Sequence, residues 1–305
     1  MGNPTVVWSP AYEVDIGPHV FPTVKYRLVR ERLLSTGVLG EADFVEAQPV
    51  SDGLLARVHT PEFLAKIHED RFTSMERILL EVPFSPALAH AGRVCCGGTL
   101  LAARLALVDG VGIHVGGGFH HAFPDHGEGF CLLNDVAVAA MALLDEGAVQ
   151  RVLVLDLDVH QGNGTAAIFA DDPRVFTLSV HQERNYPTLK PHSDLDLGLD
   201  DRTGDVAYMA VLREHLPAVL ERFRPELTFY LAGADPYRED QLGRLCLSIE
   251  GLRERDAYVL GTLRSAGLAV AVTLAGGYAV READTVRIHA ATVEEAARAL
   301  TLPRA

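Results

Sequence analysis

Three residues that bind metals alternate along one apolar run of the sequence. Asp156, Asp158 and His160 are spaced by two, so in an extended chain they point to the same side. Asp235 follows a second apolar run. Asp158, His160 and Asp235 would together offer two carboxylates and one imidazole to a metal ion. Such a set leaves coordination positions for water and substrate, which a catalytic metal requires.

The ligand types limit which metal could bind, and the neighbouring residues limit how many ions could bind. Zinc is the first candidate, but an oxygen-rich ligand set also suits iron, manganese or cobalt. A two-metal site would need carboxylates at positions 162 and 233, and both are glycine, so a single metal is favoured. The alternative is a buried Asp/His cluster without metal, which is disfavoured because burying two unpaired carboxylates is costly.

Two adjacent histidines, His120 and His121, follow a run of three glycines. A neutral histidine can accept a proton from water and return it to a leaving amine. Each ring needs a partner on its other nitrogen to fix its tautomer, and Asp156 and Asn163 could fill that role. Tyr278 follows a glycine pair, and its phenol could donate a hydrogen bond to an oxyanion.

These residues must be positioned by strands and helices. Short runs rich in Val, Leu and Ile predict strands buried on both faces, at 5–8, 112–115, 152–157, 175–180, 227–231 and 268–274. Segments with helical spacing lie between them, at 24–35, 61–69, 86–108, 134–146, 206–223, 249–266 and 293–300. This alternation predicts an α/β fold, a mostly parallel sheet with helices on both faces. The chemistry-bearing residues follow four of these strands, where open parallel sheets place their active sites.

Composition limits the class of protein. The chain has 305 residues, 48% of them hydrophobic, and the sequence shows neither repeats nor linkers, so we expect one domain over residues 1–305. A net charge of −14 argues against a nucleic-acid partner, which requires a basic face. The acidic stretch 194–201 is expected to form a solvated loop, and Asn134 and Asp135 to cap the helix that follows them.

The cysteines and the apolar stretches indicate in which cellular compartment the protein is expected. The four cysteines, Cys95, Cys96, Cys131 and Cys246, form no CxxC pair, so buried free thiols are expected rather than disulfides or a cysteine-rich zinc site. The longest apolar stretch, 268–275, is too short to span a bilayer. The first residues lack the pattern of a signal peptide. A cytoplasmic protein without a membrane span is the expectation.

Four separated motifs resemble the histone deacetylase superfamily in order and spacing. They are GGGFHHA with GFCLLND between 116 and 135, DLDVHQGNGT at 156–165, AGADP at 232–236 and AGGY at 275–278. HVFPTVKY at 19–26 and VHTPEF at 58–63 extend the resemblance over nearly the whole chain. The Gln-Gly-Asn sequence at 161–163 looks like the class IV deacetylases and their bacterial relatives. The resemblance implies an arginase–deacetylase fold, an eight-stranded parallel sheet between helices.

The resemblance also implies a role for each candidate residue. The zinc ligands map onto Asp158, His160 and Asp235, and the tyrosine that stabilises the transition state maps onto Tyr278. His121 becomes the general base, with Asn163 as its partner, and His120 pairs with Asp156.

Further sites follow from the same resemblance. Gly129 and Phe130 would line a narrow tunnel for the acyl-lysine, with Tyr186 on the other wall. A structural potassium ion would use main-chain oxygens of Asp156, Asp158, His160 and Val180 and side-chain oxygens of Asp156 and Ser179. A second potassium site could involve Phe169 and Val175.

The function these features predict is a metal-dependent amidohydrolase that removes acetyl or longer acyl groups from lysine side chains of peptides or proteins. Acetylated polyamines or other small acylated amines are the alternative substrates. That alternative is weakened because relatives with this activity carry a long insertion, and none is obvious here. A non-catalytic acyl-lysine reader would be expected to lack the ligands or the tyrosine, and a urea-releasing enzyme would need the two-metal carboxylates. Acyl length and oligomeric state stay open.

Overall fold

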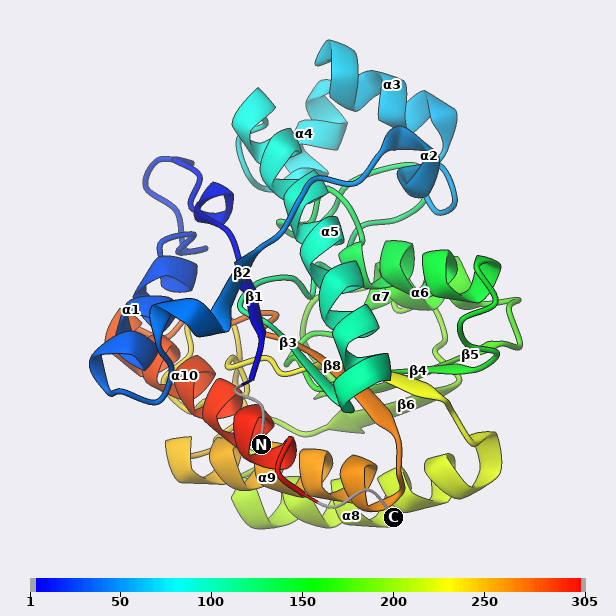
Figure 1. The fold of residues 1–305 in the computed structure, drawn as a ribbon. Coiled ribbons are helices and arrows are strands. Elements are labelled where there is room, and N and C mark those ends of the chain that lie inside the picture. The colour runs from blue at the N-terminus through cyan, green and yellow to red at the C-terminus, as the bar shows by residue number, and fades with distance from the viewer. Residues whose placement is uncertain (1–3, 303–305) are drawn as a thin grey trace.

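The computed structural model describes residues 4–302, which form an eight-stranded sheet between layers of helices (Figure 1). Every neighbouring pair of strands is parallel. The order across the sheet is β2 (Phe44–Glu46), β1 (Val6–Trp8), β3 (Val111–His114), β8 (Ala269–Thr273), β7 (Leu227–Leu231), β4 (Val152–Asp156), β5 (Val175–Gln182) and β6 (Leu195–Leu199). The predicted α/β class is confirmed.

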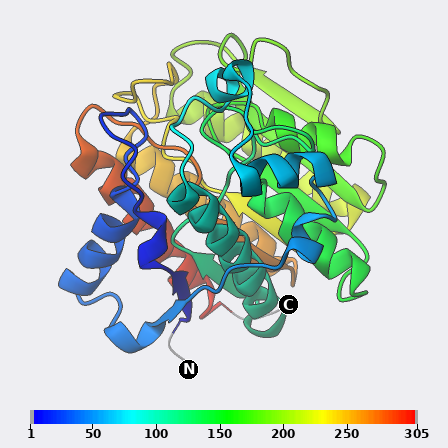
Figure 2. The same ribbon diagram turned by 90° about the horizontal axis from the view of Figure 1, so that it is seen from above.

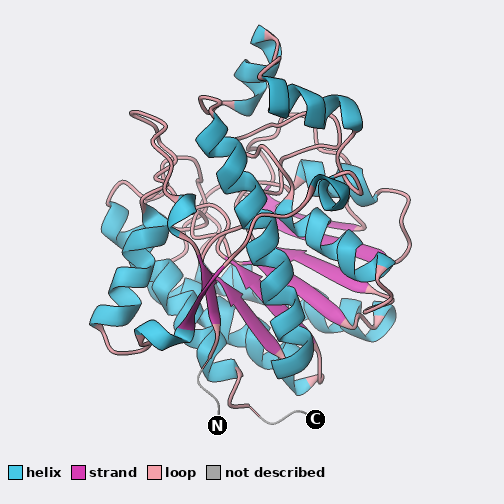
Figure 3. Ribbon diagram, turned by 45° about the horizontal axis from the view of Figure 1, so that its top comes forward, coloured by secondary structure: helices cyan, strands magenta, loops and turns pink. Residues whose placement is uncertain are grey.

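Helices cover both faces of the sheet (Figure 3). One face packs against α5 (Pro86–Asp109), α6 (Asp135–Asp145) and α7 (Asn163–Phe169), and the other packs against α1 (Lys25–Ser35), α8 (Asp205–Phe223), α9 (Ile249–Ser265) and α10 (Glu282–Ala299). In β4, Val152 and Val154 join the first core and Leu153 and Leu155 join the second. The central strands therefore need apolar residues at every position.

The short helices α2 (Asp52–Leu55), α3 (Pro61–Glu69) and α4 (Ser74–Leu80) gather at the top of Figure 1, and Figure 2 looks down on them. α3 begins as the sequence predicts, with Thr60 Oγ1 accepting a hydrogen bond from Phe63 N (3.2 Å) and Pro61 in the first turn. The segment 293–300 proves to be the end of the longer helix α10.

The two edge strands of the sheet, β2 and β6, were not predicted from the sequence. The expected solvated loop at 194–201 is wrong, because Leu195–Leu199 forms β6 and pairs with β5. Its alternating Asp and Leu residues suit a strand with one exposed side. Asp194 accepts a hydrogen bond from Thr177 N (2.8 Å), and Asp196 accepts one from Gln161 Nε2 (3.1 Å). These acidic side chains thus fasten the edge of the sheet instead of facing only water.

Within residues 4–302, α5 is the one helix long and apolar enough to cross a membrane by length and composition. It packs against β3, β8 and α6, and 56% of its apolar window is buried. This is the environment of a core helix. Cys95 and Cys96 lie buried on it, and Cys131 is buried elsewhere. Cys246 is exposed, so the expectation of buried thiols is wrong for that residue.

The topology gathers the chemistry-bearing segments. β3, β8, β7 and β4 are neighbours in the sheet, so the loops that follow them meet at one edge. Arg255 on α9 ties two of these loops together from below, with Nη1 donating to Gly233 O (2.7 Å) and Leu157 O (3.3 Å). The guanidinium is fully buried, and the carboxylate of Asp256 at 2.8 Å balances its charge.

A buried histidine predicts how stability depends on pH. His59 Nδ1 donates to Phe123 O (3.0 Å) and Nε2 accepts from Asn134 N (3.1 Å), so the ring is held in its neutral form. Burial lowers the pKa of His59 to about 4 from 6.5. The unfolded chain therefore binds one more proton than the folded chain between these values, and stability falls as pH falls through that window.

We expect His59→Gln to flatten this dependence between pH 4 and pH 6.5. The free energy of unfolding should lose a slope of ~1.4 kcal/mol per pH unit relative to the parent. Urea denaturation of both proteins at several pH values measures it. His90→Ala, at an exposed position on α5, serves as the control. Parallel curves for His59→Gln and the parent would contradict the assignment.

Candidate active site

The three predicted metal ligands converge. One ligand atom from each of Asp158, His160 and Asp235 lies within 4.8 Å of the others, and all three residues are buried. His160 Nδ1 lies 3.0 Å from Asp158 Oδ1 and 3.5 Å from Asp235 Oδ2. Asp158 and His160 come from the loop after β4, and Asp235 comes from the loop after β7.

Backbone groups orient both carboxylates. Asp158 accepts from His160 N (2.9 Å) and Gly276 N (2.8 Å), and Asp235 Oδ1 accepts from Val159 N (2.9 Å). Asp235 Oδ2 is buried and accepts no hydrogen bond from the described part of the chain. A side chain at Gly276 would collide with both carboxylates, so glycine there keeps open the space between them.

This arrangement fits a divalent cation. Burial raises the pKa of Asp235 to about 7. Burial alone would lower the pKa of His160, but its hydrogen bond to Asp158 and the nearby charge of Asp235 outweigh that effect and raise it to about 10. The two carboxylates therefore retain a positive charge between them, as a proton on His160. A metal ion supplies that charge instead, and the oxygen and nitrogen donors suit zinc and neighbouring divalent metals.

The histidine pair lies beside this cluster. His120 Nδ1 is 2.6 Å from Asp156 Oδ2, His121 Nδ1 is 2.6 Å from Asn163 Oδ1, and the two Nε2 atoms are 3.1 Å apart. Burial opposes charge on both rings, but Asp156 and Asp158 outweigh it at His120 and raise its pKa to about 9. Burial and the His120 charge hold the pKa of His121 well below its usual value. Near pH 7, His121 is therefore the neutral member of the pair.

A cleft of about 190 Å³ leads to these residues. It is lined by Glu81, His121, Gly129, Phe130, His160, Asn185, Tyr186, Leu242 and Tyr278. The Tyr186 ring lies edge-on to His121, with centroids 5.0 Å apart, and Phe130 lies 5.8 Å from Tyr278. The residues suggested for a tunnel thus line one cleft together with the candidate catalytic residues His121 and Tyr278.

Backbone conformation shapes the cleft wall. Gly129 has φ of +52°, and a side chain there would press on His121 and Tyr186. Phe130 also takes a positive φ, +69°, which is unfavourable for a bulky residue and is found mostly where surrounding structure enforces it. Hydrogen bonds from Gly129 N to Leu79 O and from Phe130 N to Leu80 O, both 3.0 Å, hold this turn against α4.

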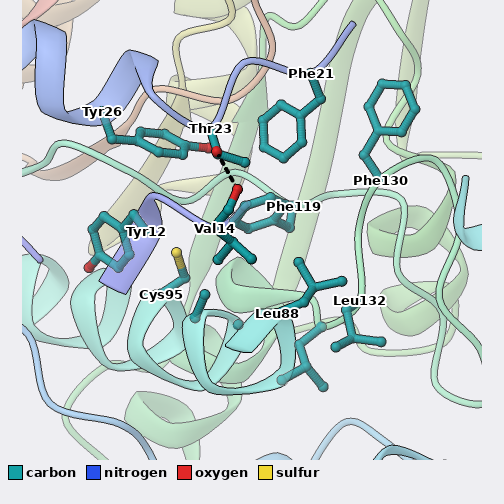
Figure 4. Close-up of a pocket in the computed structure, with 13 residues that line it drawn as sticks. Tyr12, Val14, Phe21, Thr23, Tyr26, Leu88, Cys95, Phe119, Phe130 and Leu132 are labelled. Carbon is teal, nitrogen blue, oxygen red and sulfur yellow. Dashed lines mark hydrogen bonds between the residues drawn. The ribbon is translucent and has the colours of Figure 1, made fainter. Parts of the chain in front are cut away.

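Small apolar cavities continue inward from the site. One of about 20 Å³ touches both histidines and Tyr278, and the next, of about 30 Å³, lies among the side chains in Figure 4. The two cavities share Phe21, Tyr26, Phe119 and Phe130 in their walls. Side chains rather than backbone therefore separate the catalytic groups from the inner apolar space.

Several residues that position the catalytic groups were not predicted from the sequence. Asp240 Oδ2 accepts from Tyr278 N (2.7 Å). Lys25 Nζ donates to Ala275 O (2.8 Å) and lies 5.7 Å from the centroid of the Tyr278 ring. Burial lowers the pKa of Lys25 to about 8. Lys25 belongs to the motif at 19–26, which signalled a family resemblance but gave no role to that residue.

Asp135 also acts differently from the expectation. Asn134 caps α6, accepting from Ala137 N (2.9 Å). Asp135 instead reaches the glycine-rich loop, where it accepts from Gly118 N (3.0 Å) and Phe119 N (2.7 Å). It thereby fixes the segment that carries the two histidines.

The residues suggested for a potassium site also lie together in part. Asp156 pairs with Ser179 across β4 and β5, and both border a cavity of about 10 Å³. Val180 follows on β5. Phe169 ends α7 and Val175 begins β5. Potassium binding at either place stays a prediction.

Comparisons with known proteins agree with this geometry. The histone deacetylase domain matches residues 19–294. An uncharacterized protein of Picosynechococcus is 41% identical, with 95% of this chain and 96% of that protein covered. Histone deacetylase 2 of Arabidopsis thaliana is 30% identical, with 96% and 79% covered. The histone deacetylase-like amidohydrolase of Pseudomonas aeruginosa is also 30% identical, with 84% and 71% covered.

Solved structures share the fold. The HD domain of HDA15 superposes with a TM-score of 0.78 at 25% identity, covering 97% of this chain and 90% of that one. An HDAC homolog solved with SAHA gives a TM-score of 0.81 at 22% identity, with 97% and 84% covered. The fold is thus the arginase–deacetylase fold that the resemblance implied. The matching domain and the relatives place the protein in the class of deacetylases. The chain belongs to the histone deacetylase family.

Metal binding should displace the proton held at His160. We expect zinc added to metal-free protein at pH 7 to release between one and two protons, one from His160 and a fraction of one from Asp235, with an affinity that rises as pH rises. Calorimetry in buffers of different ionisation enthalpy counts the protons. His160→Ala and Asp235→Ala should lose tight binding, whereas His90→Ala should bind as the parent does. Unchanged zinc affinity in His160→Ala would contradict the ligand assignment.

Proposed function

We propose that this protein is a metal-dependent deacylase that removes acetyl or longer acyl groups from lysine side chains. The observation that carries the proposal is the meeting of three groups beside one cleft. These are the buried Asp158, His160 and Asp235 cluster, the neutral His121 and the phenol of Tyr278. Amide hydrolysis needs all three, as an electrophile, a base and a donor to the developing oxyanion.

The shape of the cleft supports acyl-lysine as the substrate. Its walls include Phe130 and Tyr186, and His121, His160 and Tyr278 also line it. An unbranched aliphatic stem fits between aromatic walls, and its hydrocarbon is favourably removed from water there. The four-carbon stem of lysine would then carry its acylated nitrogen to the catalytic groups. The same fit extends to small acylated amines, which the assay below separates.

His121 and Asn163 are arranged for proton transfer. The Asn163 oxygen faces His121 Nδ1, so that nitrogen carries the proton and Nε2 carries the lone pair. That lone pair lies 3.1 Å from His120 Nε2. His121 Nε2 accepts a proton from the attacking water. Asp156 holds His120 in its charged form, and His120 or His121 then protonates the departing amine.

A divalent metal held by Asp158, His160 and Asp235 would polarise the amide carbonyl and acidify the water. Tyr278 donates a hydrogen bond from its hydroxyl group to the oxyanion. Burial and the nearby carboxylates of Asp158 and Asp235 raise the pKa of the phenol well above its usual value, so it stays protonated throughout. The backbone bond to Asp240 and the contact with Lys25 keep its ring in place.

Removing the base or the phenol should abolish turnover without removing the metal. We expect His121→Ala and Tyr278→Phe each to lower kcat at least ~100-fold, the usual size of such contributions. Tyr258→Phe, on α9 away from the cleft, should keep the kcat of the parent. Elemental analysis checks that zinc content is unchanged. A normal kcat in either site variant would overturn its assigned role.

The inner cavities predict a preference for short acyl groups. They are small as packed, so a long chain must displace aromatic side chains. We expect acetyl-lysine peptides to react faster than octanoyl or myristoyl peptides, and Phe119→Ala to shift the ratio toward the longer chains. A chelator should stop every reaction. Faster turnover of acetylspermidine than of acetyl-lysine peptide would favour the small-amine alternative.

A further inference from the structure

A carboxylate outside the predicted catalytic set reaches the general base through one intervening side chain. Glu128 lies on the segment between the histidine pair and Phe130. Its Oε1 accepts from Asn163 Nδ2 at 2.6 Å and from Tyr186 Oη at 2.8 Å. The Glu128 side chain is only 15% exposed, so these bonds are shielded from competing water.

The bond to Glu128 sets the direction of the Asn163 amide. An amide has one donor end and one acceptor end. Since Nδ2 donates to the carboxylate, Oδ1 must face the other way, and it lies 2.6 Å from His121 Nδ1. Only a protonated Nδ1 satisfies that contact. Through the Asn163 amide, the Glu128 carboxylate therefore determines which nitrogen of His121 carries the proton.

We propose that Glu128 is a positioning residue for His121, supplying through the Asn163 amide the negative charge and the hydrogen-bond direction that an aspartate at position 163 would supply directly. The inference rests on the proposed function, in which His121 is the general base. It also explains how a neutral partner can serve that base, since the charge lies one side chain further out.

The surrounding groups keep Glu128 ionised. Burial opposes its charge, but the hydrogen bonds from His126, Tyr186 and Asn163 outweigh that effect and lower its pKa. His126 Nε2 lies 3.3 Å from Glu128 Oε2. The carboxylate of Glu81 is the like charge that faces it.

The groups that face His121 directly are His120, His160 and Asp158. The two histidines disfavour a proton on His121, and Asp158 favours one. Glu128 adds to the favourable side from the opposite end of the ring. Its removal should therefore make His121 a weaker base.

The same geometry explains why an aspartate would not suit position 163 while Glu128 is present. It would bring a second carboxylate to the 2.6 Å contact now made by the Asn163 amide. Two like charges at this distance in a shielded site are unfavourable. One of the two positions thus needs a carboxylate and the other an amide. Exchanging the two groups, with Gln at 128 and Asp at 163, should therefore restore the hydrogen bond between them.

An exchange experiment tests this pairing on the metal-loaded enzyme. The variants are Glu128→Gln, Asn163→Asp and the double variant, with Tyr186→Phe as the matched control that removes only the other bond to the same oxygen. Each is assayed for kcat and KM against pH on an acetyl-lysine peptide. Circular dichroism and thermal melting check that every variant is folded.

We expect Glu128→Gln to lower kcat about 10-fold, the usual effect of losing such a supporting contact, and to move the acidic limb of the kcat profile to lower pH. The shift follows because His121 loses a charge that favours its protonated form. Asn163→Asp should also be impaired, and the double variant should recover most of the loss. Tyr186→Phe should raise KM and leave the acidic limb in place.

A second readout is independent of turnover. In metal-free protein, nitrogen NMR of the imidazoles should show His121 as the Nδ1–H tautomer, and Glu128→Ala should give a mixture of tautomers. Wild-type kcat and pH profile in Glu128→Gln would overturn the inference. An unchanged His121 tautomer in Glu128→Ala would overturn the inference about Glu128, whether or not the protein is an active deacylase. A lack of deacylase activity in the parent protein would overturn only the proposed function.

Discussion

The site depends on keeping two carboxylates, Asp158 and Asp235, side by side and out of water. Such a pair is unfavourable unless a cation lies between them and hydrogen bonds fix the remaining oxygens. The backbone N–H groups of Val159, His160 and Gly276 supply those bonds. The absence of a side chain at Gly276 leaves the space, and the buried Arg255 ties the two ligand loops together. Each of these features suits the binding of a divalent cation at adjacent strand ends.

The central part of the fold and the reacting groups could be predicted from the sequence because their signals are local. β4, β7 and β8 are covered on both faces, so each is a largely apolar run, and β5 is apolar at Val175, Phe176, Leu178 and Val180. The spacing of two in Asp156, Asp158 and His160 marks one side of an extended segment. The edge strands β2 and β6 have only one covered side each, and their mixed polar sequence resembles a loop.

The residues that support the reacting groups could not be found in this way. Lys25 lies 250 positions from Ala275, whose carbonyl it holds, and Asp240 lies 38 positions from Tyr278. Such contacts depend on how distant loops meet in the folded chain, and the hydrophobic periodicity of the sequence does not indicate them. Glu128 lies close in sequence to the histidine pair, yet its role becomes visible only when Asn163 and Tyr186 are seen on the same oxygen. The charge around the two histidines is thus divided, with Asp156 on one ring and a neutral amide backed by Glu128 on the other.

We propose that one metal ion at Asp158, His160 and Asp235 converts this arrangement into a deacylase. The most direct measurement is to titrate metal-free protein with zinc while following hydrolysis of an acetyl-lysine peptide. We expect activity to rise in proportion to added zinc and to saturate at one ion per chain. Full activity in metal-free protein, or saturation only at two ions per chain, would contradict it.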